Sequence, residues 1–205
     1  MNTNEIGISD LFAAVSKVDD AARTRLHARL TAGAEKAGLL DVAYRTIDTP
    51  VGTLLLAMTE KGLLRVAYDC ENHDRALETI AAEISPRILN APKRLDAAAR
   101  EIDEYFAGAR TDFDLPLDFG LSRGFRRTVL RRLRRIAYGR TASYAAIAAM
   151  VDNPKAVRAV GTACATNPLP IVVPCHRVVR SDGTLGQYVG GAKVKRNLLT
   201  LENAL

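Results

Sequence analysis

Residues 167–177 read Asn-Pro-Leu-Pro-Ile-Val-Val-Pro-Cys-His-Arg, a short apolar run that leads to a cysteine and a histidine. Three prolines lie in this stretch, and proline fixes φ and biases the preceding residue towards extended geometry. The backbone around Cys175 and His176 is therefore restrained before any tertiary contact forms. Such preorganisation suits a reactive group, and we interpret the rest of the chain as serving this thiol.

The Cys-His pair by itself does not distinguish a reactive site from a structural one. A lone cysteine is more often a small buried hydrophobe, with its histidine neighbour a satisfied polar group. A reactive thiol also needs help, because a free thiol with a pKa of about 8.5 is mostly protonated at neutral pH. Whether Cys175 is reactive or structural therefore has to be judged from the sequence around the pair.

Charge is distributed very unevenly along the chain. Residues 121–200 hold fifteen lysines or arginines and two aspartates, a net charge of +13, so the rest of a chain with a total of +6 carries −7. A basic C-terminal half on an acidic body is the footprint of a nucleic-acid-binding region. For the arginine-rich run 123–140 alone, a solvated helix with a core-facing apolar stripe is an equal alternative.

Composition places the chain among globular proteins. Its 205 residues are 48% hydrophobic, enough for one large domain or two small ones. The polar N-terminus lacks the layout of a secretory signal, and no run is long enough to cross a membrane. Three widely spaced cysteines indicate a reducing compartment, so we expect a cytoplasmic protein. Because the cysteines and histidines stand singly, we predict no metal site.

The pattern of apolar residues gives an outline of the elements. Residues 8–40 predict one or two helices that end before Gly38. Three short strands separated by turns predict an antiparallel meander, over residues 42–47, 53–58 and 64–68. Helices are expected at 73–84 and 92–106, a connector at 112–119, and an all-helical region from 122 onward.

A helix-turn-helix is predicted over residues 143–164. Asn153 is placed to cap the second helix and Pro154 to occupy its first position. That helix carries small residues, which allow close approach either to a nucleic-acid groove or to another helix. They are Ala156, Ala159, Gly161 and Ala163.

Five motifs together resemble one family. They are Arg158-Ala-Val-Gly161, Asn167-Pro168, Pro174-Cys-His-Arg-Val178, Gly186-Gln-Tyr-Val-Gly-Gly191 and Lys195-Arg-Asn-Leu-Leu-Thr-Leu-Glu202. The chain resembles the methylated-DNA–protein-cysteine methyltransferases, the O6-alkylguanine-DNA alkyltransferase family, over about residues 41–203 and most densely over 122–203.

The resemblance implies an α/β (α+β) two-domain fold. We expect a ribonuclease-H-like N-terminal domain with a small antiparallel sheet at 41–120 and an all-helical, winged-helix-like domain with the helix-turn-helix at 121–205. Residues 1–40 form a helical N-terminal extension that the resemblance does not cover. The implied activity is DNA repair by direct reversal, in which Cys175 takes the alkyl group of O6-alkylguanine, and of O4-methylthymine, and is irreversibly inactivated. No cofactor and no small-molecule methyl donor are needed, and the protein acts as a monomer.

The resemblance also assigns roles to residues. A relay of cysteine, water, histidine and glutamate corresponds to Cys175, His176 and Glu202, with Glu202 orienting the imidazole. Double-stranded DNA is bound from the minor groove, where base identity is poorly encoded, and the damaged base is flipped out. Arg158 fills the gap, and Tyr144 pushes the phosphate and donates a proton to the leaving guanine.

Further residues belong to the DNA surface or to the pocket. Lys155, Ala156, Ala159 and Gly161 are expected on the DNA surface. The pocket and its supports are Asn167, Pro170, Tyr188, Val189, Gly190 and Lys195. Val189 stands where the family often has serine, so backbone amides must bind O6 and the tolerance for larger alkyl groups is expected to differ.

Two other classes of function stay open as alternatives. A protein that binds damaged DNA without reacting is disfavoured because relatives of that kind lack the thiol that Cys175 provides. A cysteine hydrolase unrelated to DNA is disfavoured by the charge of +13 over residues 121–200 and by the lack of a separate oxyanion-loop signal.

Overall fold

The computed structural model describes residues 8–205, with side chains from Asp20 onward, and the chain divides into residues 1–40 and residues 41–205. The described residues of the first unit contain one helix, α1 (Ile8–Lys36), which ends shortly before Gly38 with its φ of 64°. Leu26 and Leu30 on this helix are 63% and 57% exposed. Within the extension predicted at 1–40, residues 8–36 are thus one helix with these two apolar side chains on its surface, and residues 1–7 lie outside the described residues.

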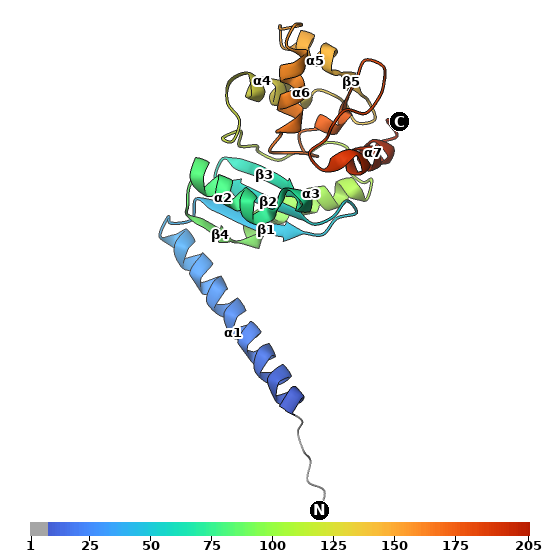
Figure 1. The fold of residues 1–205 in the computed structure, drawn as a ribbon. Coiled ribbons are helices and arrows are strands. Elements are labelled where there is room, and N and C mark those ends of the chain that lie inside the picture. The colour runs from blue at the N-terminus through green and yellow to red at the C-terminus, as the bar shows by residue number, and fades with distance from the viewer. Residues whose placement is uncertain (1–7) are drawn as a thin grey trace, which may run out of the picture. The chain divides into compact units, whose positions relative to one another are not determined.

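A four-stranded sheet forms the first part of residues 41–205 (Figure 1). Its strands are β1 (Val42–Ile47), β2 (Leu54–Thr59), β3 (Gly62–Tyr68) and β4 (Ile88–Asn90), in the order β3-β2-β1-β4. The predicted antiparallel meander of β1, β2 and β3 is confirmed. The sheet as a whole is mixed, because β4 pairs parallel to β1. A strand of three residues is too short to show a period of two in the sequence.

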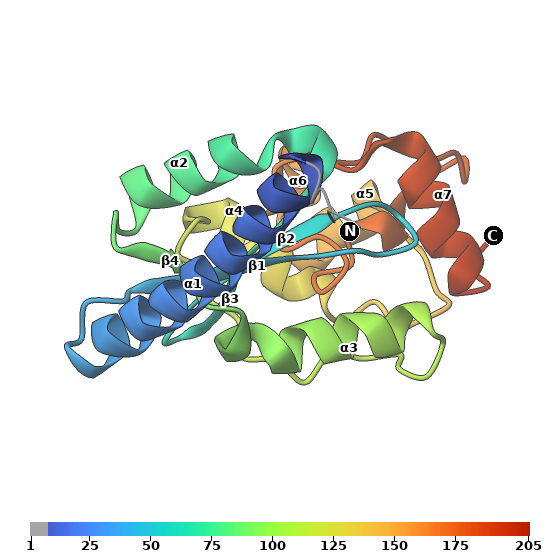
Figure 2. The ribbon, with the colours of Figure 1, turned by 90° about the horizontal axis from the view of Figure 1, so that it is seen from below.

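Helices follow the meander as predicted. After η1 (Asp69–Glu71), helix α2 (His73–Glu83) begins where the Asn72 side chain accepts from two backbone amides, and Ala76 and Ile80 pack into the sheet core beside Leu55 and Leu64. The second helical segment is η2 (Pro92–Leu95) followed by α3 (Asp96–Phe106). Figure 2 shows the strands lying between α2 and α3. The strands β2 and β3 are almost entirely buried, whereas β1 and β4 are partly exposed.

The edge strand β3 forms backbone hydrogen bonds with two later segments of the chain, the connector after α3 and the loop before Cys175. The amide of Leu63 donates to the carbonyl of Pro116 at 2.8 Å, in the connector after α3. Gly62 makes this approach feasible, since a Cβ there would lie 2.1 Å from the same carbonyl oxygen. Further along β3, the amide of Val66 donates to the carbonyl of Pro168 at 2.8 Å. The proline-rich loop that precedes the cysteine is therefore fixed directly on the sheet.

The C-terminal part is mainly helical. Its elements are α4 (Gly124–Leu133), β5 (Ala142–Ser143), α5 (Tyr144–Met150), α6 (Val157–Ala165), η3 (Cys175–Arg177), β6 (Val178–Val179) and α7 (Gly191–Leu201). The expectation of an all-helical region needs a correction, because β5 and β6 pair as two parallel strands. Two residues leave no periodic signal, and the pairing joins positions 36 residues apart, Ala142 and Val178.

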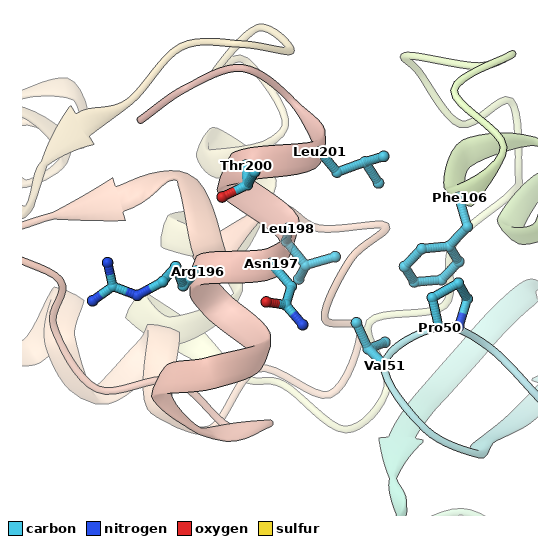
Figure 3. Close-up of a pocket in the computed structure, with 8 residues that line it drawn as sticks. All are labelled: Pro50, Val51, Phe106, Arg196, Asn197, Leu198, Thr200 and Leu201. Carbon is cyan, nitrogen blue, oxygen red and sulfur yellow. The ribbon is translucent and has the colours of Figure 1, made fainter.

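Within residues 41–205, a cleft of about 330 Å³ lies between the sheet-containing part and the mainly helical C-terminal part (Figure 3). Pro50, Val51 and Phe106 lie on one side of it, and the α7 residues Arg196, Asn197, Leu198, Thr200 and Leu201 on the other. Helix α7 therefore lies beside the end of α3.

Among the described residues, none of the helices combines the length and the apolar character that crossing a bilayer requires.

Candidate functional site

The loop before Cys175 turns sharply twice. Ile171 has a φ of 73°, and the amide after it donates to the carbonyl of Pro170 at 2.9 Å, which makes a γ-turn. At Pro174, with φ −79° and ψ 63°, the amide of Cys175 donates back across the proline at 2.8 Å and forms an inverse γ-turn. A β-branched residue with positive φ is strained by about 1–3 kcal/mol. The buried surroundings hold this strained path and aim Cys175.

The Cys175 thiol lies at the start of η3 and is 1% exposed. The Asn167 side-chain amide donates to Sγ at 3.1 Å and to the carbonyl of Val173 at 2.9 Å, while its oxygen accepts from the amide of Leu169 at 3.0 Å. Asn167 thus braces the turn, as the sequence predicts. Burial raises the pKa of Cys175 to about 11, although the Asn167 hydrogen bond and the charge of Lys195 act in the opposite direction.

His176 and Glu202 form a buried pair. Nε2 of His176 lies 2.8 Å from Oε1 of Glu202, and the two residues are 0% and 1% exposed. Burial would raise the pKa of Glu202, but hydrogen bonds from His176 and Arg177 outweigh it and hold this pKa at about 2. Glu202 is therefore ionised and Nε2 must carry the proton. Burial lowers the pKa of His176, so the imidazole is neutral and Nδ1 holds a free lone pair.

Nδ1 of His176 is buried and has no hydrogen-bond partner within the described part of the chain. A buried nitrogen lone pair without a partner is uncommon in native structures. A neutral histidine next to the cysteine, held through its other nitrogen by a carboxylate, is equipped to take up a proton.

Two residues in this network were missed by sequence reasoning. Arg177 was counted with the exposed basic charges, but it is 4% exposed and donates Nε to Oε2 and Nη2 to Oε1 of Glu202, at 2.8 and 2.9 Å. Tyr105 on α3 donates its hydroxyl to the same Oε1 at 2.7 Å. Arg177 lies inside the motif Pro174-Cys-His-Arg-Val178, which is the signal that could have found it. Tyr105 had none, because it lies 97 residues from Glu202 in the chain.

The loop of residues 186–191 closes one side of the site. Tyr188 is buried, packs edge-on to the His176 ring at 6.3 Å, and shares a hydrogen bond of 2.9 Å with the hydroxyl of Tyr68. A Cβ at Gly190 would lie 2.8 Å from the Tyr68 ring, so this glycine permits the contact. Val189 is half-buried. Tyr68, the last residue of β3, is thus a further residue of the site that the sequence did not indicate.

Lys195 was predicted as a pocket residue and is fully buried on α7. Its Nζ donates to the carbonyl of Val178 at 2.6 Å. Burial lowers the pKa of Lys195, and the neighbouring thiols Cys175 and Cys164 act against this. Lys195 and Arg177 are two of the fifteen basic residues of 121–200, and neither is part of an exposed basic surface.

The helix-turn-helix is present, with one correction. Helix α5 begins at Tyr144, and the Ser143 hydroxyl caps it by accepting from the amide of Ala146 at 3.0 Å. The second helix begins at Val157, so the predicted cap at Asn153 and the predicted first helical position at Pro154 are wrong. Both residues lie in the turn, where the Asn153 carbonyl accepts from the amide of Ala156. The turn between the two helices is thus longer than the capping pattern at Asn153 and Pro154 indicated, since α6 begins only at Val157.

The predicted DNA-facing residues lie on one short segment. Lys155, Arg158 and Ala159 are exposed, and Ala156 and Gly161 are half-buried. Tyr144 is half-buried, and its hydroxyl lies so close to Gly186 that a Cβ there would be 2.3 Å away. Burial, followed by the nearby thiols Cys164 and Cys175, raises the pKa of Tyr144 to about 12, which keeps its hydroxyl protonated. The structure thus places Tyr144 between the helix-turn-helix and the site loop.

Among the described residues, no cluster of three or more histidine, cysteine or acidic side chains is arranged to hold a metal ion. The groups of the site that could take part in chemistry are the Cys175 thiol, the His176 imidazole and the Glu202 carboxylate. With a helix-turn-helix beside them, the fold and site define a thiol-based transferase built on a nucleic-acid-binding module.

Comparisons with known proteins agree with this class. The family model of the 6-O-methylguanine DNA methyltransferase ribonuclease-like domain matches residues 42–119, and that of the DNA binding domain of the same methyltransferase matches residues 124–204. A methylated-DNA–protein-cysteine methyltransferase of Mycolicibacterium paratuberculosis is 39% identical over 161 residues, which cover 78% of this chain and 92% of the relative. The constitutive enzyme of Bacillus subtilis is 41% identical over 162 residues, covering 78% and 94%.

A solved structure of Mycobacterium tuberculosis OGT in complex with DNA has a TM-score of 0.66 and 38% identity, and the match covers 79% of this chain and 93% of that one. The chain therefore belongs to the 6-O-methylguanine DNA methyltransferase family, whose members repair O6-methylguanine directly by moving the methyl group from DNA to a cysteine of the protein.

Proposed function

We propose that Cys175 is the acceptor in this chain and that it takes methyl or larger alkyl groups from O6 of guanine in DNA. The observation that carries the proposal is the juxtaposition of the buried Cys175 thiol with the His176–Glu202 pair, in which Nδ1 of His176 is left free. In the reaction the bond from sulfur to the alkyl carbon forms while the bond from that carbon to O6 breaks. The product at Cys175 is a thioether.

Proton transfer accounts for the role of His176. With a pKa of about 11 for Cys175, only about one thiol in ten thousand is ionised at neutral pH. A resting thiolate is therefore scarce, and the proton has to leave as the alkyl group arrives. Nδ1 of His176 takes it through a water molecule, and the ionised Glu202 stabilises the imidazolium that results. The departing guanine receives a proton from Tyr144, and both residues return to their resting states by exchange with solvent.

Each molecule acts once. A thioether is not hydrolysed at neutral pH, and no group in the site can regenerate the thiol, so transfer is stoichiometric and inactivates the protein. The DNA supplies the alkyl group, so neither a cofactor nor a separate methyl donor takes part.

DNA binding is assigned to the helix-turn-helix. Arg158 and Ala159 are exposed on α6, and small side chains there allow the helix to enter the minor groove. A base whose O6 lies inside the duplex must be flipped out to reach a buried thiol. Arg158 takes its place in the stack, and the monomer binds one lesion.

Two narrower assignments concern substrate range and compartment. Because residue 189 is valine, O6 is bound by backbone amides of the loop 186–191, and both larger alkyl groups and O4-methylthymine are substrates to be tested. The three cysteines are free thiols in the structure, which suits a reducing compartment, and we infer action in the cytoplasm.

The experiment is a stoichiometric reaction with a duplex that contains one O6-methylguanine, followed by intact mass spectrometry. We expect one added methyl group per chain, located by peptide mapping at Cys175. The matched control is Cys164→Ser, which removes the other buried thiol and should leave the reaction intact, whereas Cys175→Ser should abolish it. Duplex binding without any adduct would refute the proposal and favour a protein that only binds the lesion.

A further inference from the structure

The ribonuclease-like domain extends a side chain into the candidate site. We propose that Tyr105, on α3 of that domain, is a positioning residue for alkyl transfer: its hydroxyl fixes the orientation of Glu202 and limits how strongly Glu202 binds His176. This inference rests on the proposed function, since it concerns the step in which His176 accepts the proton of Cys175.

The contact is short and fully shielded from water. Tyr105 is 0% and Glu202 1% exposed, and the hydroxyl lies 2.7 Å from Oε1. Because Glu202 is ionised, the hydroxyl must be the donor. Burial, together with the charge of Glu202, raises the pKa of Tyr105 far above its ordinary value, so the hydroxyl keeps its proton throughout the pH range of the reaction.

The oxygen that Tyr105 contacts is the one that holds the histidine. Oε1 of Glu202 receives Nε2 of His176 at 2.8 Å, Nη2 of Arg177 at 2.9 Å and the Tyr105 hydroxyl. Within residues 20–205, Oε2 receives only Nε of Arg177 at 2.8 Å and, at 3.5 Å, the amide of Gly139. Three donors share one oxygen, so each hydrogen bond reduces the charge available to the others. Tyr105 thereby weakens the hold of Glu202 on His176.

The Tyr105 ring is held in place on several sides. It packs against Phe106 at 5.3 Å, Phe113 at 5.4 Å and Tyr138 at 6.2 Å between ring centroids. On α3, Ala98, Ile102 and Tyr105 are buried at helical spacing. The neighbouring Phe106 faces α7 across the cleft of Figure 3. The position of the hydroxyl is therefore set by aromatic residues of the ribonuclease-like domain and by Tyr138.

The charged and titratable groups around the pair act in known directions. Glu202 faces Tyr105 from α3, His176 and Arg177 from η3, and Tyr138 from the segment before β5. His176 is influenced in addition by Lys195 of α7, which lowers its pKa as Arg177 does. Of these groups, Tyr105 alone comes from residues 41–120.

The test is Tyr105→Phe, which removes one oxygen and keeps the ring. Loss of a hydroxyl donor concentrates charge on Oε1 and favours protonated His176, so the acid limb of the pH profile of single-turnover transfer should move up by about half a unit or more. At neutral pH we expect a rate about fivefold to fiftyfold lower, because Glu202 loses its restraint. The substrate is the duplex with one O6-methylguanine.

Tyr138→Phe is the matched control. Its hydroxyl donates to the carbonyl of Leu201 at 3.0 Å, and its ring packs on the same side of the network. It should leave both the rate and the pH profile as in the wild type. Phe113→Leu loosens the packing of Tyr105 but keeps its hydroxyl, so it should lower the melting temperature without moving the acid limb.

A second variant covers the case in which Tyr105→Phe fails to fold. Site-specific 3-fluorotyrosine at position 105 is a stronger donor of nearly the same size, and it should move the acid limb down. An acid limb unchanged in either variant, with wild-type protein transferring the methyl group normally, overturns the inference. Failure of the wild type to transfer would instead overturn the proposed function.

Discussion

Glu202 is predicted to stabilise the fold more than any surface carboxylate. Its side chain is 1% exposed and accepts two hydrogen bonds from the Arg177 guanidinium, itself 4% exposed. Glu202→Gln preserves the shape but leaves Arg177 as a buried charge without a counter-charge and turns one acceptor into a donor. Removing one partner of a buried ion pair costs about 3–5 kcal/mol. We expect a loss of this size in the free energy of unfolding at neutral pH.

The pH dependence of this loss follows from the pKa of Glu202. The folded pKa is about 2, below the ordinary value of 4.5, so between these values the unfolded chain binds more protons than the folded one. The ionised carboxylate thus contributes stability that is fully present above about pH 5 and is lost as pH falls towards 2, about 3 kcal/mol in all. His176 has the same sign, since its pKa is also lowered.

The assay is urea unfolding followed by far-ultraviolet circular dichroism, at neutral pH and at steps down to about pH 3. The difference between wild type and Glu202→Gln should shrink as pH falls. The control Glu104→Gln removes an ion pair with Arg110 at 2.8 Å, in which the Glu104 side chain is 36% exposed. This loss should stay below about 1 kcal/mol. A loss as small for Glu202→Gln, or one that does not shrink with pH, would refute the reasoning.

Two further substitutions test the DNA side of the site. Gly186→Ala places a Cβ 2.3 Å from the Tyr144 hydroxyl, so Tyr144 must move, and single-turnover transfer measured by rapid quench should slow about tenfold to a hundredfold while the melting temperature changes little. An unchanged rate would remove Tyr144 from the reaction. Arg158→Ala should weaken duplex binding, measured by fluorescence anisotropy, and lower the slope of log K against log salt by about one. A slope equal to that of the wild type would place Arg158 away from the DNA.

Much of the local structure follows from the sequence alone. The strands of the meander, the helices at 73–84 and 92–106 and the helix-turn-helix are set by local spacing and by turn residues, and the structure has each of them. Nearby motifs likewise identify Cys175, His176 and Asn167. Their mutual contacts span at most eight residues within one proline-rich loop, where the backbone has few alternatives.

The pairing of segments that are far apart in the chain depends on the tertiary structure. Strand β4 and the pairing of β5 with β6 are too short to leave a periodic signal, and they exist because other strands offer them a partner. The start of α6 at Val157 depends on a longer turn than the cap residues indicate.

The class of protein, and Cys175 and His176 as candidate site residues, can be predicted from the sequence, because these depend on residue type and short spacing. The inward position of Arg177, the support of the pocket loop by Tyr68 and the contact of Tyr105 with Glu202 follow from the fold and could not be read from the sequence. A buried charge or hydroxyl must find a partner wherever the fold brings one, and that partner comes from another part of the chain.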